Sequence, residues 1–298
     1  MDASLTPLNL ALGLIACVLA VITGAYLAKK QAHAFKGEGN QGAGGPTSND
    51  SLPLVTFADY GDMRFLHLGT PAVQGSMKIS QPFDIHLNYV QRMMGWLLFT
   101  DIEKVQHMHA MQLGLGAASL TKFCYHHLGM QTTAVELNPR VIATCKRWFH
   151  LPENDAKLQV IVGDAGEAAG QDRWQGKIDA LQIDLYDQAS ACPVIDSEDF
   201  YRNCRELLTD QGCMTVNLFG RAMSYTASVQ KISAAFGEEA VWSFKPTSAG
   251  NTIVLAFRTA RTLDPIKLQI QAQAIQTRWP LPASKWLKVL APIQSTKA

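Results

Sequence analysis

The sequence lacks the features that mark nucleic-acid binders, metal proteins and disulfide-stapled secreted domains. Its 26 Lys and Arg residues are matched by 25 Asp and Glu residues, so there is no excess of basic charge for a nucleic-acid partner. Its six cysteines form no CxxC pair and stand at no spacing from histidine that is typical of a metal site. Scattered cysteines of this kind are typical of a reducing compartment. We therefore expect no nucleic-acid partner and no bound metal.

The N-terminal segment lacks charge. Residues 8–28 read LNLALGLIACVLAVITGAYLA, an uncharged stretch of about 20 residues, which is long enough as a helix to cross a hydrocarbon core of about 30 Å. The start, MDASLTP, has no basic residue, which argues against a cleaved signal peptide. Because Lys29 and Lys30 follow the stretch, the positive-inside rule places the remainder of the chain in the cytoplasm.

We therefore predict a single-pass anchor helix over residues 1–30 in the inner (cytoplasmic) membrane, with the main domain in the cytoplasm. One alternative is a buried helix of a globular fold. Another is a lipoprotein, because Leu14-Ile15-Ala16-Cys17 has the form of a lipoprotein cleavage box. The next segment, residues 31–51, is rich in Gly, Asn and Ser and is expected to be a flexible linker.

Residues 52–103 are expected to form a small N-terminal β-rich subdomain with one helix. Two alternating stretches flank the turn signal Asp59-Tyr60-Gly61-Asp62, and this predicts a hairpin. A third strand and then a run of apolar residues at helical spacing follow the hairpin. The three strands and the helix are expected at residues 54–57, 63–68, 73–79 and 85–99.

The stretch that suggests a ligand comes next. Residues 105–113 form an apolar run that ends in Gly114-Leu115-Gly116, and after a helix-permissive segment a second apolar run ends at Glu136. Glycines allow the backbone to turn sharply and to approach a ligand closely. An acid about 20 residues after such a turn can accept both hydroxyls of a ribose. The stretch predicts a nucleoside site, and the alternative is a tight turn followed by a surface glutamate.

Strands and helices alternate over residues 104–260, which predicts an α/β fold with a doubly wound, Rossmann-like sheet. Five further strands, the last two forming an antiparallel edge hairpin, are expected at residues 158–162, 178–183, 213–218, 241–244 and 252–257. Helices are expected at residues 139–149, 197–208 and 224–236. The tail, residues 261–298, holds one amphipathic helix at residues 266–276.

Acids directly follow three of these strands. Ligands of doubly wound sheets bind outside the carboxyl ends of the strands, so Glu136, Asp164 and Asp184 are expected at one rim. Asp164 can accept a hydrogen bond from an exocyclic amine such as that of adenine, or it can cap the helix that follows. Asp184 and Asp187 are close in the chain, and two close carboxylates repel unless a cation such as a polyamine lies between them. The alternative for this pair is two acids of a turn.

On these motifs the chain, from about residue 57 to residue 257, resembles the polyamine aminopropyltransferase (spermidine synthase) family, and more closely its bacterial spermidine-synthase-like branch. The resemblance implies a sheet of the class I S-adenosylmethionine-dependent methyltransferase type. The matching motifs are the glycine turn, VELNPRVI around Glu136, Gly163-Asp164-Ala165, the acids Asp184 and Asp187, and Asp199-Phe200-Tyr201-Arg202.

The resemblance also implies roles for single residues. Tyr89 and Asp187 stand where the family binds the amine, and Asp184 is the candidate general base, one of the family's two catalytic aspartates. The chain departs from the family at Ala117, where the family has an Asp that contacts the donor amine, and at Val90-Gln91, where the family has His-Glu. The positions implied to bind the donor, decarboxylated S-adenosylmethionine, are Gln74, Gly114, Gly116, Glu136, Asp164 and Ala165.

We therefore interpret the chain as a transferase of polyamine biosynthesis. It would move an aminopropyl group from decarboxylated S-adenosylmethionine to a polyamine such as putrescine and release methylthioadenosine. One alternative is a methyltransferase on the same sheet, with S-adenosylmethionine as the donor. A second alternative is a membrane-tethered nucleoside-binding protein without turnover. A homodimer is among the assemblies that the sequence leaves open.

Overall fold

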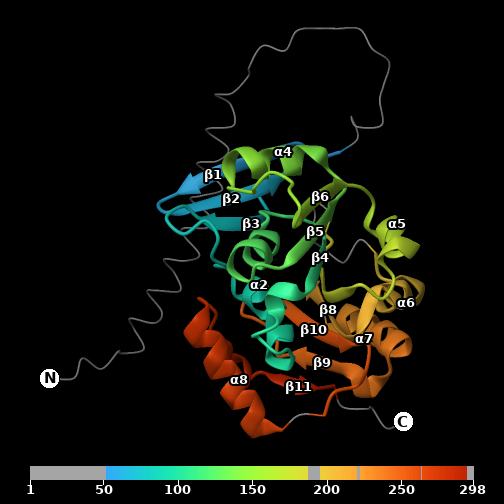
Figure 1. The fold of residues 1–298 in the computed structure, drawn as a ribbon. Coiled ribbons are helices and arrows are strands. Elements are labelled where there is room, and N and C mark those ends of the chain that lie inside the picture. Colours follow the sequence, from blue (N-terminus) through green and yellow to red (C-terminus); the bar gives the residue numbers. More distant parts are fainter. Residues whose placement is uncertain (1–51, 187–194, 220–221, 263, 294–298) are drawn as a thin grey trace, which may run out of the picture.

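The computed structural model describes residues 52–186, 195–219, 222–262 and 264–293, with two β-sheets and the helices around them (Figure 1). The small sheet is antiparallel, with strands in the order β1-β2-β3. Its strands are β1 (Val55–Tyr60), β2 (Met63–Leu68) and β3 (Val73–Lys78). The hairpin turns at Gly61, which has a φ of +55° that glycine adopts without strain. The expected hairpin and third strand are both present.

The large sheet has the strand order β11-β9-β10-β8-β7-β4-β5-β6. Neighbours from β8 through β7, β4 and β5 to β6 are parallel, whereas β10, β9 and β11 join antiparallel at the other edge. The chain runs outward from β4 to β6 and then returns to β7 on the other side of β4, so β4 and β7 mark the point where the winding reverses. The strands are β4 (His109–Leu113), β5 (Gln131–Glu136), β6 (Leu158–Val162), β7 (Ile178–Ile183), β8 (Leu208–Phe219), β9 (Val241–Phe244), β10 (Asn251–Phe257) and β11 (Leu290–Pro292).

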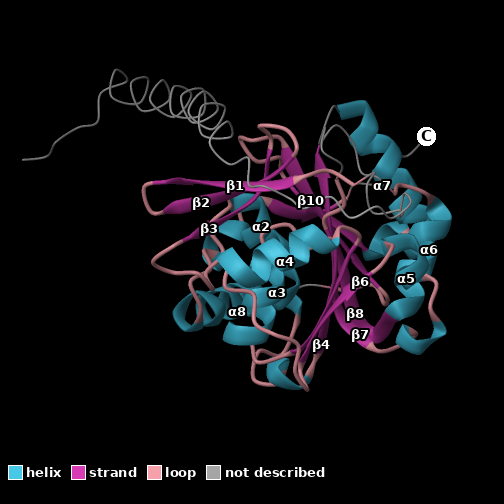
Figure 2. Ribbon diagram, turned by 90° about the horizontal axis from the view of Figure 1, so that it is seen from above, coloured by secondary structure: helices cyan, strands magenta, loops and turns pink. Residues whose placement is uncertain are grey.

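Helices cover both faces of this sheet, which confirms the expected doubly wound architecture. Figure 2 shows α5, α6 and α7 on one face and α2, α3, α4 and α8 on the other. Alternate residues of the strands therefore enter two separate cores: Met111 and Leu181 pack toward the first group, and Ala110 and Ala180 toward the second. The helices are α2 (Asn88–Met93), α3 (Ser119–Lys122), α4 (Pro139–Trp148), α5 (Ala165–Ala169), α6 (Glu198–Leu207), α7 (Ala222–Phe236), α8 (Pro265–Arg278) and α9 (Ala283–Trp286).

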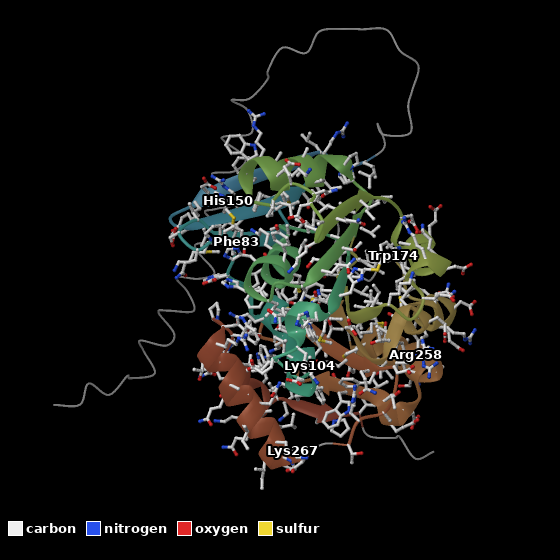
Figure 3. All side chains as sticks on the ribbon, in the orientation of Figure 1. Phe83, Lys104, His150, Trp174, Arg258 and Lys267 are labelled. Carbon is white, nitrogen blue, oxygen red and sulfur yellow. The ribbon has the colours of Figure 1, made fainter. Side chains whose placement is uncertain are left out.

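Helix starts follow the capping chemistry of the sequence. The side chains of Asn138, Asp164, Ser197 and Asp264 each accept a hydrogen bond from a backbone N–H in the first turn of the helix that follows. The core beneath the first group of helices includes Trp174, labelled in Figure 3, which is buried with its ring edge-on to His109 at 5.7 Å between centroids. His109 also lies within hydrogen-bond distance of Thr133 on β5, so this histidine is part of the core.

The structure differs from the expected elements in several places; β8, for example, begins at Leu208 and not at residue 213. In place of the helix expected at residues 85–99 there are α2 and a 3-10 helix, Gly95–Phe99. Gly95 packs so closely against the Phe244 ring that a Cβ there would approach it to 2.9 Å. The strand expected from residue 105 begins at His109, after a 3-10 turn at Val105–His107. The expected edge hairpin is covered by β11 from the tail, and the outer strand carries Pro292, a residue that edge strands tolerate.

The predicted localisation in the inner membrane is contradicted. Within the described part of the chain, which begins at Leu52, no helix is both long and apolar enough to cross a bilayer. The longest of these helices, α7, has 15 residues, whereas a span needs about 20. The stretch that prompted the prediction, residues 8–28, and the predicted linker, residues 31–51, lie outside the described residues.

The small sheet is held against the large one by a close backbone approach. Gly75 on β3 lies so near the glycine turn that a Cβ there would be 2.6 Å from the backbone nitrogen of Ala117. The hydroxyl of Ser119 donates to the carbonyl oxygen of Ser76 at 3.1 Å beside this contact. At the outer end, Arg64 on β2 donates to both carboxylate oxygens of Asp59 and to the carbonyl oxygen of Trp148 at the end of α4.

We expect Gly75→Ala to destabilise the protein by about 1–3 kcal/mol, the usual cost of overpacking, because its new methyl group would meet backbone rather than a movable side chain. Urea unfolding followed by circular dichroism measures the change. Gly170→Ala is the matched control, since the nearest atom to its Cβ would lie at an ordinary 3.7 Å. Equal stability of the two variants would mean that β3 does not need to lie against the turn.

Candidate functional site

A cavity of about 870 Å³ lies at the carboxyl ends of the parallel strands, with residues of β2 and β3 in its wall. This volume falls within the range of small-molecule sites. Among its described lining residues there are three carboxylates and no Lys, Arg or His. The lining includes these residues predicted from the sequence: Gln74, Tyr89, Gly114, Gly116, Glu136, Asp164, Ala165 and Asp184. Asp187 lies outside the described residues.

The glycine turn brings the ends of β4 and β7 into contact. Gly114 has a φ of +89°, and a Cβ there would lie less than 3.0 Å from the carbonyl oxygen of Asp184. Gly116 has a φ of +51°, and its Cβ would lie 3.1 Å from the carbonyl oxygen of Gln74 on β3. Glycine is therefore required at the first position both for its conformation and for space. The turn links the acid after β7 with the wall formed by the small sheet.

Glu136 ties the glycine turn to the start of α4. Its Oε2 accepts from the backbone N–H of Leu115 at 3.0 Å, and its Oε1 accepts from the backbone N–H of Asn138 at 2.8 Å. Burial raises the pKa of this carboxyl, and the backbone donors oppose the rise because they favour the charged form. Each carboxylate oxygen has a second lone pair, so the group can still accept from a bound ligand. Glu136 is half-buried and holds two backbone N–H groups, so it is more than an exposed surface glutamate.

Asp164 is a helix cap that also lines the cavity. Its Oδ1 accepts from the backbone N–H of Glu167 at 3.0 Å, which is the capping role that the sequence left open. The neighbouring Ala165 is buried and contributes to the same wall. Because the cap uses one oxygen, the other is available to a ligand amine, and that contact stays a prediction.

Asp184 is held by two donors from different parts of the fold. The hydroxyl of Tyr89 on α2 donates to its Oδ2 at 3.3 Å, and Nδ2 of Asn217 on β8 donates to its Oδ1 at 2.8 Å. Burial raises the pKa of the Asp184 carboxyl to about 6, although the two hydrogen bonds act to lower it. Burial and the nearby Asp184 charge raise the pKa of the Tyr89 hydroxyl well above its ordinary value. A carboxyl poised near neutral pH beside a cavity is suited to accept a proton.

Three residues of this site were not predicted from the sequence. Asn217 and Asn251 line the cavity from β8 and β10, and Nδ2 of Asn251 donates to Oδ1 of Asn217 at 3.1 Å. Tyr186 donates to the carbonyl oxygen of Asn217 at 2.9 Å and accepts from the backbone N–H of Phe219. An amide inside the apolar run CMTVNLF was the one available signal, because a buried polar side chain needs a partner.

Ala117 stands at the position where the family has an Asp that contacts the donor amine. Its side chain is 3 % exposed, packs in the core beneath the small sheet, and is not part of the cavity lining. The neighbouring Gly75 backbone leaves little room for a larger side chain.

Comparisons with known proteins bear on the family through one curated relative and on the fold through solved structures. No family model matches the chain. The chain is 30% identical over 215 residues to the polyamine aminopropyltransferase of Chromobacterium violaceum, covering 72% of this chain and 80% of that protein. It is similar in structure to a probable spermidine synthase from Corynebacterium glutamicum (TM-score 0.64, 16% identity, 80% of this chain and 90% of that one).

The same comparison finds human methyltransferase-like protein 13 in complex with SAH (TM-score 0.58, 19% identity, 72% of this chain and 98% of that one). At these identities the two structural similarities establish the fold alone. They confirm a Rossmann-like sheet of the methyltransferase type, accompanied here by the small antiparallel sheet.

The raised pKa of Asp184 predicts a pH dependence of stability. Its folded-state pKa of about 6 exceeds the ordinary 3.8, so the folded state holds the proton more tightly than the unfolded chain. This contribution is complete below about pH 4 and is lost as the pH rises through 6. We expect the free energy of unfolding of Asp184→Asn, relative to that of the wild type, to rise by about 3 kcal/mol from pH 4 to pH 7, the equivalent of about two pKa units.

Urea unfolding of both proteins at pH 4, 5, 6 and 7 measures this difference. Asp210→Asn, at an exposed position outside the cavity, is the control and should run parallel to the wild type. If Asp184→Asn also runs parallel to the wild type, the carboxyl is not desolvated in solution.

Proposed function

The chain belongs to the polyamine aminopropyltransferase family, a family of transferases, and on that premise we propose its reaction. It moves an aminopropyl group from decarboxylated S-adenosylmethionine to a polyamine such as putrescine and releases methylthioadenosine. The observation that carries this proposal is the placement of Asp184, clamped by Tyr89 and Asn217, in the same cavity as Glu136 and Asp164.

The charge of the cavity supports the decarboxylated donor over S-adenosylmethionine itself. Both proposed substrates are cations, and the described lining offers three carboxylates. S-adenosylmethionine carries an additional carboxylate, for which the described lining provides no Lys, Arg or His. Burying that charge without a cationic partner would be costly. The same argument disfavours methyl transfer, which needs the carboxylated donor.

The nucleoside of the donor would lie along the ends of β4, β5 and β6. Glu136 would accept from the ribose hydroxyls through its remaining lone pairs, while its backbone hydrogen bonds keep it oriented. Asp164 would accept from the adenine amine beside Ala165. Gly114 and Gly116 allow the backbone to approach the donor, and Gln74 contributes from the small sheet.

Asp184 would act as the general base. The neutral amine nitrogen forms a bond to the methylene carbon beside the sulfonium, the carbon–sulfur bond breaks, and its electron pair stays on sulfur in the departing methylthioadenosine. The proton that the nitrogen must lose passes to Asp184, which is mostly ionised above its pKa of about 6. Positioning can contribute about 7–11 kcal/mol and a general base about 10²–10⁴-fold. Tyr89 would orient the base, and Asp187 would anchor the remaining positive charge of the amine.

Product analysis tests the proposal directly. The full-length protein is incubated with putrescine and either decarboxylated or intact S-adenosylmethionine, and nucleoside products are separated by chromatography. Methylthioadenosine together with an aminopropylated amine is expected. S-adenosylhomocysteine would instead identify a methyltransferase. Neither product, with retained nucleoside binding, would identify a binding protein without turnover.

We expect Asp184→Asn to lower kcat by about 10²-fold or more while nucleoside affinity changes little, because an amide of nearly the same shape cannot accept the proton. Steady-state kinetics and calorimetric titration of methylthioadenosine measure the two quantities. A near-normal rate for this variant would remove Asp184 from the chemistry.

We expect Glu136→Gln to weaken methylthioadenosine binding at least tenfold. A hydrogen bond to a charged group contributes about 1.5–3 kcal/mol, and the new amide group would also place a donor against a backbone N–H. Calorimetric titration measures the affinity, with Glu153→Gln, an exposed acid paired with Lys146, as the control. Unchanged affinity in Glu136→Gln would refute the assignment of Glu136 to the ribose hydroxyls.

A further inference from the structure

Two buried asparagines stand behind Asp184, where apolar strands would ordinarily carry aliphatic residues. Asn217 on β8 is 3 % exposed, and Asn251, the first residue of β10, is 8 % exposed. The two strands are antiparallel neighbours, with Asn251 opposite Phe219 and Ile253 opposite Asn217. Asn217 and Asn251 are therefore diagonal neighbours on the same face of the sheet, within reach of each other's side chains.

The hydrogen bonds of these two amides determine how each is oriented. Asn217 donates from Nδ2 to Asp184 and accepts on Oδ1 from Asn251. Turning the Asn217 amide over would place its oxygen against the carboxylate and its NH₂ against the NH₂ of Asn251, so both contacts would become repulsive. The backbone of Asn251 is itself held in a closed turn, because it exchanges hydrogen bonds with the backbone N–H and the hydroxyl of Thr247.

The groups that face Asp184 come from several elements. Tyr89 reaches it from α2, and Tyr186 lies in the loop after β7 and bonds the Asn217 backbone. Glu136, the last residue of β5, and Asp164, which follows β6, line the same cavity. Among the described lining residues none is basic, so hydrogen-bond donors are what stabilise the charged form of Asp184. Of its two side-chain donors, Asn217 is the closer, at 2.8 Å against 3.3 Å for Tyr89.

We propose that Asn217 and Asn251 are positioning residues for the proposed base. Asn217 holds one carboxylate oxygen of Asp184 so that the other edge meets the amine, and Asn251 locks the Asn217 amide with its NH₂ toward the carboxylate. This inference rests on the proposed function. The proton affinity of Asp184 then depends on Asn251, which is connected to it through two successive hydrogen bonds and contacts neither the base nor the reacting atoms.

The pair of hydrogen bonds from Asn251 to Asn217 and from Asn217 to Asp184, called the relay below, predicts a specific change in the pH profile of kcat/KM. Asn217→Leu removes a donor to the carboxylate, and Asn251→Leu leaves the Asn217 amide free to turn. The acidic limb of the pH profile of kcat/KM reports the pKa of the base in the free enzyme. Both variants are expected to move this limb to higher pH, by about one unit or more for Asn217→Leu and by a smaller amount, up to about one unit, for Asn251→Leu. Because both act through one hydrogen bond, the double variant should match Asn217→Leu alone.

The matched control is Thr252→Val, a nearly isosteric polar-to-apolar change at the next residue of β10, which points to the opposite face of the sheet and is absent from the cavity lining. It should leave the limb unmoved. Methylthioadenosine affinity, measured by calorimetry, should stay within about threefold of wild type in all variants, because none of them alters Glu136 or Asp164, the groups proposed to bind the nucleoside. Equal loss of kcat at every pH, without movement of the limb, would mean that the asparagines only fill space.

A second measurement does not require turnover. The destabilisation caused by Asn217→Leu or Asn251→Leu should grow as the pH rises through 6, because the charged form of Asp184 loses its donor. Placed in an Asp184→Asn background, either change should lose this pH dependence. Urea unfolding from pH 5 to pH 8 measures both. A destabilisation that is independent of pH, or that persists unchanged in the Asp184→Asn background, would overturn the relay.

The two experiments separate this inference from the proposed function. If the wild type yields no methylthioadenosine, the proposed reaction fails while the unfolding measurements still decide whether the asparagines control Asp184. If the wild type is active and the limb of Asn251→Leu coincides with that of the wild type, the relay fails and the proposed reaction stands.

Discussion

The site depends on the contact between two stretches of backbone at the centre of the sheet. The carbonyl oxygen of Asp184 lies against the α-carbon of Gly114 so closely that no side chain fits there. This contact fixes the distance between the acid after β7 and the glycine turn after β4, at the point where the winding of the sheet reverses. A second close approach, of Gly75 to Ala117, brings the small sheet over the same turn. One cavity can therefore hold a nucleoside and present an acid to the group attached to it.

The electrostatics of the cavity follow from its construction. Three strand ends each deliver one carboxylate, and each carboxylate is held by neutral donors: backbone N–H groups at Glu136 and Asp164, a phenol and an amide at Asp184. Neutral donors orient an anion without neutralising it, so the cavity stays attractive to cations. They also only partly offset the cost of burial, which is why the pKa of Asp184 rises to about 6. The same arrangement can favour a cationic donor, bind an amine and accept its proton.

Periodicity and turn chemistry predicted most of the sheet, and they failed where packing decided the outcome. The strands at residues 158–162 and 178–183 coincide with β6 and β7, because short buried runs bounded by glycine and acids have few alternatives. The helix expected at residues 85–99 ends at Met93 and is followed by a 3-10 helix from Gly95, which packs against the Phe244 ring of β9. The residues around position 95 do not indicate this contact in the sequence. At position 117 the sequence indicated only that the family's Asp is absent, and the tertiary structure shows that the Ala117 side chain packs beneath the small sheet.

By itself the sequence determined which residues stand at the ends of the strands: two glycines, then acids after β5, β6 and β7. Strand ends share a rim in any doubly wound sheet, so their meeting needs no knowledge of packing. Only the tertiary structure decided what surrounds each acid. Asn217 reaches Asp184 from β8 and is itself bonded by Asn251 from the antiparallel strand β10. Tyr89 reaches Asp184 from α2, a helix that precedes the large sheet in the chain. A hydrogen bond depends on distance in space, and these partners are separated by tens of residues along the chain. The proton affinity of the proposed base is therefore a property of the folded protein.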